Sequence, residues 1–448
     1  MQGRNRAALT ALVLVLTLAW RVAISVAVAP EWEKKRGMAV APDSYTHLAR
    51  TLIDQKVLGY GRYGATPTSV RGPGFPLWLA AGMLVGGDDL GWLRLWASLP
   101  GALGAALITW LLAGRYGSAA AGVGGLLAGC HPIPVLGSAR LLGDEFYGVL
   151  GLVAAALLAK AVSDREERGS PAYALLFGGF LFLIAHLLTR SSALLTWVAL
   201  LFVFVLVRPG FWERFGSSRK SNEGVSASRR PIVIILIIAL VPAGIWSWRT
   251  SRLEGRPVYM HSLTAFNFWI GEAHHRYGFA NTWEETRRRE LRLVFEHGGL
   301  DDEKILSFSH AALEPKAVAH LEKRLQSEAI DHVLHHPLNY AYRGLHGIYR
   351  FWVAAQTKPW PPAYVLPIVV FVLLVMLGSV RILRERAAVD RLAVALLLAV
   401  VLHNLAYAAV LPTAKMSAQI YPSAAYLAGI GAAVIARLSV RRLEGSSS

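Results

Sequence analysis

The sequence is poor in cysteine and in charged side chains. Its single cysteine, Cys130, excludes an intramolecular disulfide. Asp, Glu, Lys and Arg make up only 17% of the 448 residues, whereas soluble globular chains carry about a quarter. Acidic residues are the scarcer kind, with 29 Asp and Glu against 46 Lys and Arg, so the net charge is +17. Because no basic stripe is interleaved with aromatic residues, we exclude nucleic acid as a partner.

The sequence is rich instead in long apolar runs, and hydrophobic residues make up 54% of it. Runs of about 20 apolar residues are long enough to cross a bilayer, and helices satisfy their own backbone hydrogen bonds there. We therefore predict an all-α polytopic membrane protein with about ten transmembrane helices. The runs are 7–29, 92–114, 117–137, 144–162, 172–189, 192–208, 231–249, 362–382, 390–411 and 419–437. The first is longer than the apolar part of a signal peptide, so we expect an uncleaved helix.

Basic residues alternate between the loops and predict the orientation of the chain. The N-terminal segment and the loops 208–230 and 381–391 hold clusters of Lys and Arg, whereas the intervening short loops hold few. The positive-inside rule then places both termini in the cytoplasm. If the shorter apolar segment 73–86 also spanned, the cluster at 208–230 would lie outside. We therefore predict that this segment dips into the outer leaflet as a juxtamembrane helix.

This topology divides the chain into three parts. Residues 1–249 form an N-terminal transmembrane module, whose first outer loop, 30–72, carries a second juxtamembrane helix at 43–56. Residues 250–361 are dense in charge and predict a mainly helical extracytoplasmic domain. Residues 362–448 supply the last transmembrane helices and a short cytoplasmic tail.

Acidic and basic residues gather at the predicted outer face. Asp43 begins an amphipathic helix, Asp144 and Glu145 begin the fourth transmembrane helix, and four cations lie at outer helix ends: Arg71, Arg190, Arg249 and Lys415. Each has a structural alternative, because acids cap helix N-termini and cations snorkel to lipid headgroups. Ionisable residues in membrane segments are also candidates for function. General bases together with cations that stabilise a departing phosphate suit a reaction on an anionic lipid.

Several segments resemble the GT-C glycosyltransferases, in particular the protein-mannosyltransferase and aminoarabinose-transferase branch. Residues 42–52, followed by Arg-Gly-Pro-Gly-Phe-Pro at 71–76, are similar to the first outer loop of that branch. Further similar segments follow in the same order, at 142–145, 187–190, 248–249 with 267–272, and 415–422. Ser191 and Lys415 depart from the branch, which has proline and arginine at these places.

The resemblance implies a GT-C-like enzyme of the bacterial inner (plasma) membrane. Such an enzyme transfers a sugar from a polyprenyl-phosphate donor to a lipid, glycan or protein acceptor on the outer face, with inversion at the anomeric carbon. By the same resemblance Asp43 is the general base, Asp144 or Glu145 assists it, and the four outer cations bind the lipid phosphate. The resemblance requires no soluble cofactor. It leaves open whether the three acids bind a divalent metal.

Two functions of other classes also fit the sequence. A transporter or lipid flippase would have similar helices, although we find no inverted repeat and no matching pair of broken helices. A non-catalytic GT-C-like assembly subunit would keep the fold with weakened motifs. We expect an enzyme, because the charges gather at the outer face rather than near the membrane midplane.

Overall fold

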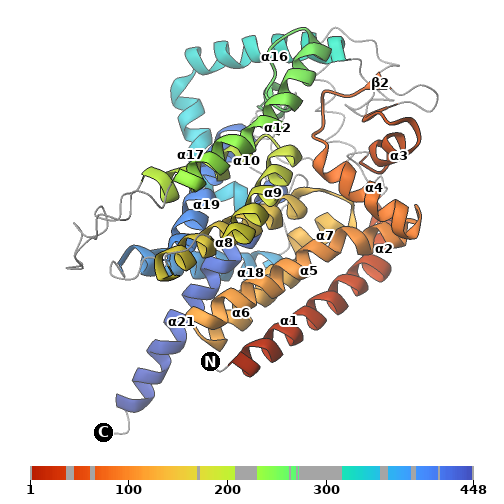
Figure 1. Cartoon of the computed structure of the whole chain (residues 1–448). Coiled ribbons are helices and arrows are strands. Elements are labelled where there is room, and N and C mark those ends of the chain that lie inside the picture. Colours follow the sequence, from red (N-terminus) through yellow and green to blue (C-terminus); the bar gives the residue numbers. More distant parts are fainter. Residues whose placement is uncertain are drawn as a thin grey trace.

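The computed structural model describes residues 3–36, 45–60, 66–168, 172–206, 230–261, 264–268, 271, 315–353, 362–384, 390–411 and 414–445. These residues are almost entirely helical (Figure 1). The helices of the first half are α1 (Gly3–Ala23), η1 (Ile24–Val28), α2 (Ala29–Arg36), α3 (Tyr45–Gln55), α4 (Gly74–Gly86), α5 (Leu90–Arg115), α6 (Ser118–Cys130), α7 (Pro132–Ala139), α8 (Asp144–Arg168), α9 (Tyr173–Thr189), α10 (Ala193–Leu201) and η2 (Phe202–Leu206). The helices of the second half are α12 (Arg230–Glu254), α16 (Pro315–His335), α17 (Pro337–Val353), α18 (Pro362–Arg384), α19 (Arg391–Val410), α20 (Ala414–Ser417) and α21 (Tyr421–Gly445).

The described part of the chain contains eight helices that are long and apolar enough to cross a membrane. They are Gly3–Glu31, Leu90–Arg115, Ser118–Ala139, Asp144–Asp164, Pro231–Glu254, Val365–Arg384, Arg391–Val410 and Tyr421–Val440. Three shorter apolar helices accompany them: Gly74–Gly86, Tyr173–Thr189 and Ala193–Phe204. Each of the ten predicted runs coincides with a long or a short apolar helix. The prediction of an all-α integral membrane protein is therefore confirmed.

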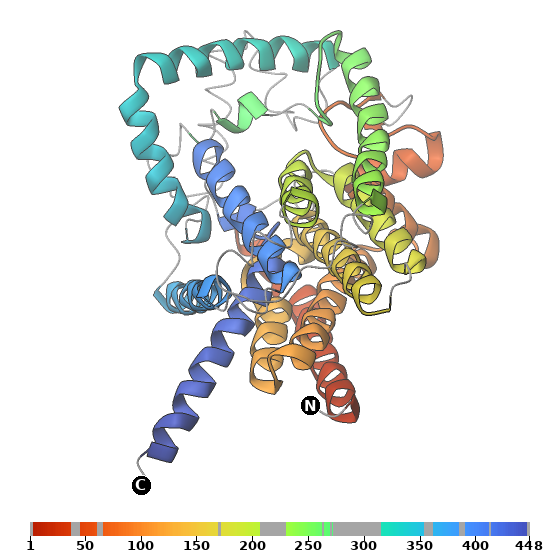
Figure 2. The same ribbon diagram turned by 60° about the vertical axis from the view of Figure 1, so that its left-hand side comes forward.

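The two termini lie at one end of the molecule, and α3, α4 and α16 lie at the other (Figures 1 and 2). Between these ends the long helices pack side by side, and those at the periphery present apolar side chains outward. On α1, for example, Leu12, Val15 and Leu16 are exposed. In a membrane protein such exposed apolar side chains face lipid, so the long helices define the membrane-embedded part.

Small residues allow the central helices to pack closely. A Cβ added at Gly125 of α6 would collide with the side chain of Thr109 on α5, and one at Gly431 of α21 would collide with the backbone of α18. Close approach through glycine is typical of membrane helix packing. Near the chain termini, Asp390 caps α19 and accepts a hydrogen bond of 2.9 Å from the Tyr426 hydroxyl of α21. These contacts fix α18, α19 and α21 against one another.

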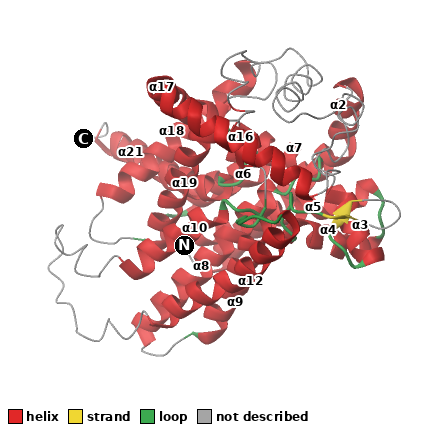
Figure 3. Cartoon of the chain, turned by 90° about the horizontal axis from the view of Figure 1, so that it is seen from above, coloured by secondary structure: helices red, strands yellow, loops and turns green. Residues whose placement is uncertain are grey.

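The first outer segment folds into two short helices and a small strand pair. β1 (Gly59–Tyr60) pairs antiparallel with β2 (Thr66–Pro67), and Figure 3 shows the pair beside α3 and α4. The predicted amphipathic helix forms as α3, with Tyr45, Leu48 and Ala49 buried as expected. The helical spacing predicts that Thr51 faces away from this apolar side, but Thr51 is buried, because its hydroxyl donates to the Gly59 carbonyl at 2.8 Å.

An ion pair joins the middle of α3 to the chain that follows α4. Arg50 of α3 lies 2.8 Å from the carboxylate of Asp88, which follows α4. At 1.5 Å per residue, a helix of α4's length reaches about 20 Å, short of the ~30 Å hydrocarbon core. This length is consistent with the dip of residues 73–86 into one leaflet, which stays a prediction.

The segment that follows the seventh predicted span is described only in part. Its sequence predicts two helices, one at 282–298 and one at 314–336 that ends before Pro337. The second forms as α16, whereas the first lies outside the described residues. Pro337 does end α16, as predicted, but it also begins α17, a helix that the sequence analysis did not predict. Proline is favoured at the first position of a helix, where its missing N–H costs nothing.

Candidate functional site

Three outer segments that are distant in sequence meet at the end of α9. The loop that carries Arg71 packs against the last residues of α9, where a Cβ added at Gly72 would lie 2.6 Å from the carbonyl oxygen of Leu188. Only glycine fits so close to that backbone. The loop therefore brings Arg71 beside Arg190, the residue that directly follows α9. Arg71 also lies over the Tyr45 ring of α3, with 5.5 Å from its guanidinium carbon to the ring centroid.

Arg190 connects this corner to the N-terminus of α8. Its Nη2 lies 2.6 Å from Oδ1 of Asp144, the first residue of α8, and the Asp144 side chain is only 2% exposed. A helix N-terminus favours a carboxylate through the helix dipole, and a buried carboxylate requires an opposite charge nearby. The pair thus places a guanidinium and a carboxylate together, shielded from solvent, at the outer end of the helix bundle.

Gln419, in the turn between α20 and α21, completes the surroundings of Asp144. Its Oε1 accepts hydrogen bonds from Ser192 at 3.0 Å and from Tyr407 at 2.8 Å. With its oxygen engaged, its Nε2 donates to Asp144 Oδ1 at 3.0 Å. The other carboxylate oxygen, Oδ2, has no hydrogen-bond partner among the described residues. Arg190 and Gln419 therefore both bind Oδ1 of Asp144, and Oδ2 can accept a hydrogen bond from a further donor.

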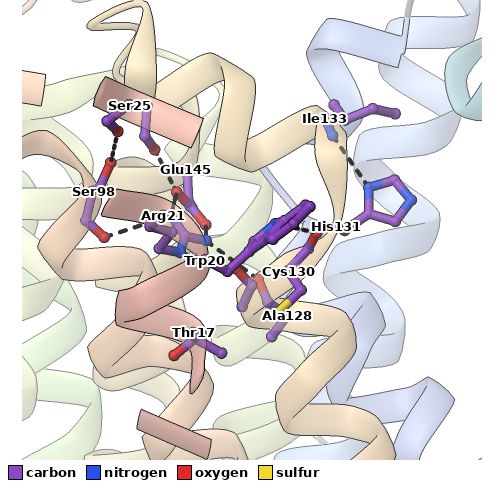
Figure 4. A network of polar contacts seen from close by, with 12 residues as sticks. Thr17, Trp20, Arg21, Ser25, Ser98, Ala128, Cys130, His131, Ile133 and Glu145 are labelled. Atoms are coloured by element: carbon purple, nitrogen blue, oxygen red, sulfur yellow. Dashed lines mark hydrogen bonds and ion pairs between the residues drawn. The ribbon is translucent and has the colours of Figure 1, made fainter. Parts of the chain in front are cut away.

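Glu145 points to a different set of partners (Figure 4). Its two oxygens accept hydrogen bonds from Nη1 and Nη2 of Arg21 on α1, and Ser138 of α7 donates to one of them as well. Arg21 donates from Nε to the Gly129 carbonyl at 2.9 Å. The Arg21 and Glu145 side chains are 1% and 3% exposed. This buried network joins α1, α6, α7 and α8 on the side of α8 away from Arg190.

The remaining predicted site residues fall into two groups. Arg249 of α12 donates to the Thr68 carbonyl at 3.0 Å and lies over the Trp246 ring, so it holds the loop that carries Arg71. The backbone of Lys415 lies in α20, four residues before Gln419, but its side chain is outside the described part. Asp43 lies outside the described residues as well.

No group of three metal-ligating side chains comes together among the described residues. Of the three acids proposed as metal ligands, Glu145 has both oxygens engaged by Arg21 and Ser138, and Asp144 shares one oxygen with Arg190. A guanidinium at ion-pair distance opposes a second cation on the same carboxylate. Asp144 and Glu145 as described thus do not assemble a metal site, and we derive no chemistry through a metal.

Two parts of this arrangement were not predicted from the sequence. Arg21 lies within the first apolar run, where no neighbouring residue marks it as a partner for an acid. Ser192, Tyr407 and Gln419 are uncharged and come from three separate segments, the start of α10, α19 and the turn before α21, so only the fold brings them together. The one available signal was Arg21 itself, because an arginine inside a membrane segment requires a counter-charge.

Comparisons with known proteins show what fold this is. No protein-family model matches the chain, and no curated protein matches its sequence. The apo oligosaccharyltransferase of Archaeoglobus fulgidus matches in structure with a TM-score of 0.55 and 13% identity, over 98% of this chain and 52% of its own. Oligosaccharyltransferase AglB from the same organism, in complex with an inhibitory peptide and a dolichol-phosphate, matches with 0.52 and 12% over the same shares. ArnT from Cupriavidus metallidurans bound to undecaprenyl phosphate has a TM-score of only 0.38 at 16% identity, over 95% of this chain and 77% of its own.

The predicted GT-C resemblance is thus confirmed at the level of the fold. The chain spans about half the length of the archaeal oligosaccharyltransferases it matches.

Proposed function

We propose that this GT-C-fold membrane protein is a glycosyltransferase that uses a polyprenyl-phosphate sugar as donor and works at the outer end of the bundle. The observation that carries the proposal is the Arg190–Asp144 ion pair at the end of α9, against which the loop that carries Arg71 packs. The fold it shares with oligosaccharyltransferases supports the same class, and one of those structures contains a dolichol-phosphate. The acceptor is a lipid, glycan or protein on the extracytoplasmic face of the plasma membrane.

The two arginines suit the leaving group of this reaction. Guanidinium groups bind phosphate through paired, charge-assisted hydrogen bonds, which are strongest where water is excluded. As the bond between the anomeric carbon and the phosphate oxygen breaks, negative charge builds up on the lipid phosphate. Arg71 and Arg190 would stabilise that charge. Arg249 supports Arg71 by holding its loop. We assign Lys415 to the same phosphate, as the family resemblance implies.

The acids suit the other half of the reaction. An acceptor oxygen attacks the anomeric carbon from the face opposite the phosphate, so the configuration inverts, and its proton passes to a carboxylate. We assign this base to Asp43. Asp144 holds Arg190 in place and offers its second oxygen to the acceptor or to the sugar. Glu145 fixes the first turn of α8 through Arg21, so that Asp144 stays aimed at Arg190.

The direct test is transfer of labelled sugar by the purified full-length protein in lipid nanodiscs. Several polyprenyl-phosphate sugars would be offered together with a membrane extract as the source of acceptor. Wild type would be compared with Asp43→Asn, and with Asp54→Asn as the matched control, since Asp54 is an exposed acid on α3. We expect transfer by wild type and Asp54→Asn, and a loss of about 10²-fold or more in Asp43→Asn.

The other outcomes discriminate between the alternatives. Equal transfer by wild type and Asp43→Asn would remove Asp43 from the chemistry and leave Asp144 as the base. Absence of transfer with every donor, while polyprenyl phosphate still binds, would favour a flippase or a non-catalytic subunit. A labelled donor that changes leaflet without losing its sugar would identify the flippase.

A further inference from the structure

The chain that follows α12 is folded back onto the end of that helix by three hydroxyl groups. Ser251 accepts a hydrogen bond from the Val258 amide at 2.9 Å, and Ser247 accepts one from the Met260 amide at 3.0 Å. Thr250 donates to the Met260 carbonyl at 3.1 Å. Because these bonds are short and come from one rigid helix, the position of residues 258–260 is well determined.

This turn holds an unfavourable backbone conformation. Met260 has φ of 60°, in the left-handed region that side chains other than glycine rarely adopt, and it is fully buried. The next amide, of His261, closes a tight turn by donating to the Tyr259 carbonyl at 2.7 Å. Strained backbone of this kind persists where the surrounding structure enforces it, and it often serves to aim a functional side chain.

The side chain that this turn presents is His261. The residue is partly exposed, but its Nδ1 is enclosed and makes no hydrogen bond with any described residue. Leaving a buried ring nitrogen without a partner costs stability unless a ligand or water completes it. The same end of α12 also carries Arg249, which bonds to Thr68 in the loop of Arg71. The turn and the Arg71 loop are therefore fixed to one helix end.

The electrostatic surroundings of His261 are cationic. The pKa of its imidazole is lowered to about 3, first by burial and then by the charges of Arg190 and Arg71. The α12 groups that hydrogen-bond to this turn are neutral hydroxyls, and the Asp144 carboxylate is already paired with Arg190. The ring is therefore neutral at physiological pH, within the electrostatic field of two guanidinium groups.

From this geometry we infer that His261 is a third phosphate-binding group, which hydrogen-bonds a phosphoryl oxygen held by Arg71 and Arg190 and takes up a proton from water as that anion binds. The inference deepens the proposed function and rests on it. An arriving phosphate cancels the repulsion between the ring and the arginines and supplies an acceptor, so it favours the imidazolium form. The affinity for the anion consequently rises as pH falls, by up to about tenfold per pH unit for one proton taken up.

The experiment is histidine ring NMR on the full-length protein in nanodiscs, with ¹³C-labelled histidine. The signal of His261 is assigned as the one lost in His261→Gln. It is titrated from pH 5 to 8.5 alone, with polyprenyl phosphate, and with inorganic phosphate. We expect His261 to stay neutral over this whole range in the protein alone, and its pKa to rise to about 7 or above with polyprenyl phosphate, since proton uptake near neutral pH requires that shift. A similar rise at millimolar inorganic phosphate alone would identify free phosphate as the ligand class.

Binding of polyprenyl phosphate is then measured over the same pH range for wild type, for His261→Gln and for His320→Gln. His320 is an exposed histidine on α16 and serves as the matched control. Wild type and His320→Gln should bind polyprenyl phosphate more tightly at low pH. The affinity of His261→Gln should increase less as pH falls.

Three results would overturn the inference. Polyprenyl phosphate that binds with the same pH dependence in His261→Gln would overturn it and leave the proposed function intact. The inference would also be overturned if the pKa of His261 in wild type did not change on lipid binding. This result does not depend on whether any variant folds. If neither the lipid nor inorganic phosphate binds at all, the proposed function fails together with the inference.

Discussion

Asp144 and Glu145 are neighbours in the chain, yet their carboxylates belong to separate networks. Asp144 is 2.6 Å from Arg190 at the outer end of the bundle, whereas Glu145 is bound on both oxygens by Arg21 of α1. Successive residues on a helix point about 100° apart, so the two acids at the start of α8 face different neighbouring helices and have different roles. The first acid is available for chemistry, and the second anchors the helix.

Neutral replacements of the two acids should therefore affect different properties, one mainly the transfer rate and the other mainly the melting temperature. We predict that Asp144→Asn loses about 10²-fold or more in sugar transfer with the smaller drop in melting temperature, because Arg190 is 16% exposed and the Asn side-chain oxygen still accepts from it. We predict that Glu145→Gln melts at a lower temperature and keeps more of its specific activity. Transfer rates and thermal melting of both variants check this, and the reverse pattern would exchange the two roles.

Arg21 should be needed for stability only while Glu145 is charged. Removing one partner of a buried ion pair leaves an unpaired charge, at a cost of about 3–5 kcal/mol. We predict that Arg21→Met strongly destabilises the protein and that Arg21→Met combined with Glu145→Leu recovers most of the loss. Unfolding of the single and double variants measures the coupling. Additive losses would show that the two residues act independently.

The close approach at Gly72 gives a test of the phosphate-binding corner that touches no charge. An alanine Cβ there would lie 2.6 Å from the Leu188 carbonyl and 2.9 Å from that of Thr189. We predict that Gly72→Ala displaces the Arg71 loop and weakens polyprenyl-phosphate binding about tenfold or more. Gly122→Ala is the control, because a Cβ at Gly122 of α6 would meet nothing within 4 Å. Unchanged binding in Gly72→Ala would separate Arg71 from the phosphate.

The dip of α4 predicts on which side of the membrane Asp88 lies. Because Asp88 is paired with Arg50 of α3, both should face the extracytoplasmic side. A cysteine at position 88 in a Cys130→Ser background should react with a membrane-impermeant thiol reagent added to intact cells. Protection from outside, with labelling only after the membrane is opened, would mean that residues 73–86 cross the bilayer and that the topology needs revision.

The sequence predicted the membrane helices and α3 well, because each depends on a local apolar pattern. It also singled out Asp144, Arg190 and Arg71 individually. It did not show that Arg71 and Arg190 adjoin, since that depends on Gly72 packing against α9. Arg249 was expected to bind phosphate, yet the described contact is to the Thr68 carbonyl, a backbone partner that no side-chain pattern reveals.

His261 shows the same limit more clearly. Fourteen histidines occur in the sequence, and nothing in the local pattern separates this one from the others. Its orientation depends on the left-handed Met260 and on hydroxyls that lie 10 to 14 residues earlier in the chain, on α12. A role that is set by backbone strain and by long-range charge becomes visible only in the folded chain.

In the proposed function, Arg71 and Arg190 hold the phosphate of a polyprenyl carrier. The most direct measurement is native mass spectrometry of polyprenyl-phosphate occupancy for wild type, for Arg71→Gln and for Arg50→Gln, an exposed arginine of α3 that serves as control. We predict saturable binding of one lipid by wild type and Arg50→Gln, and at least about tenfold weaker binding by Arg71→Gln, the loss of one charge-assisted pair. Equal occupancy in all three proteins would contradict the claim.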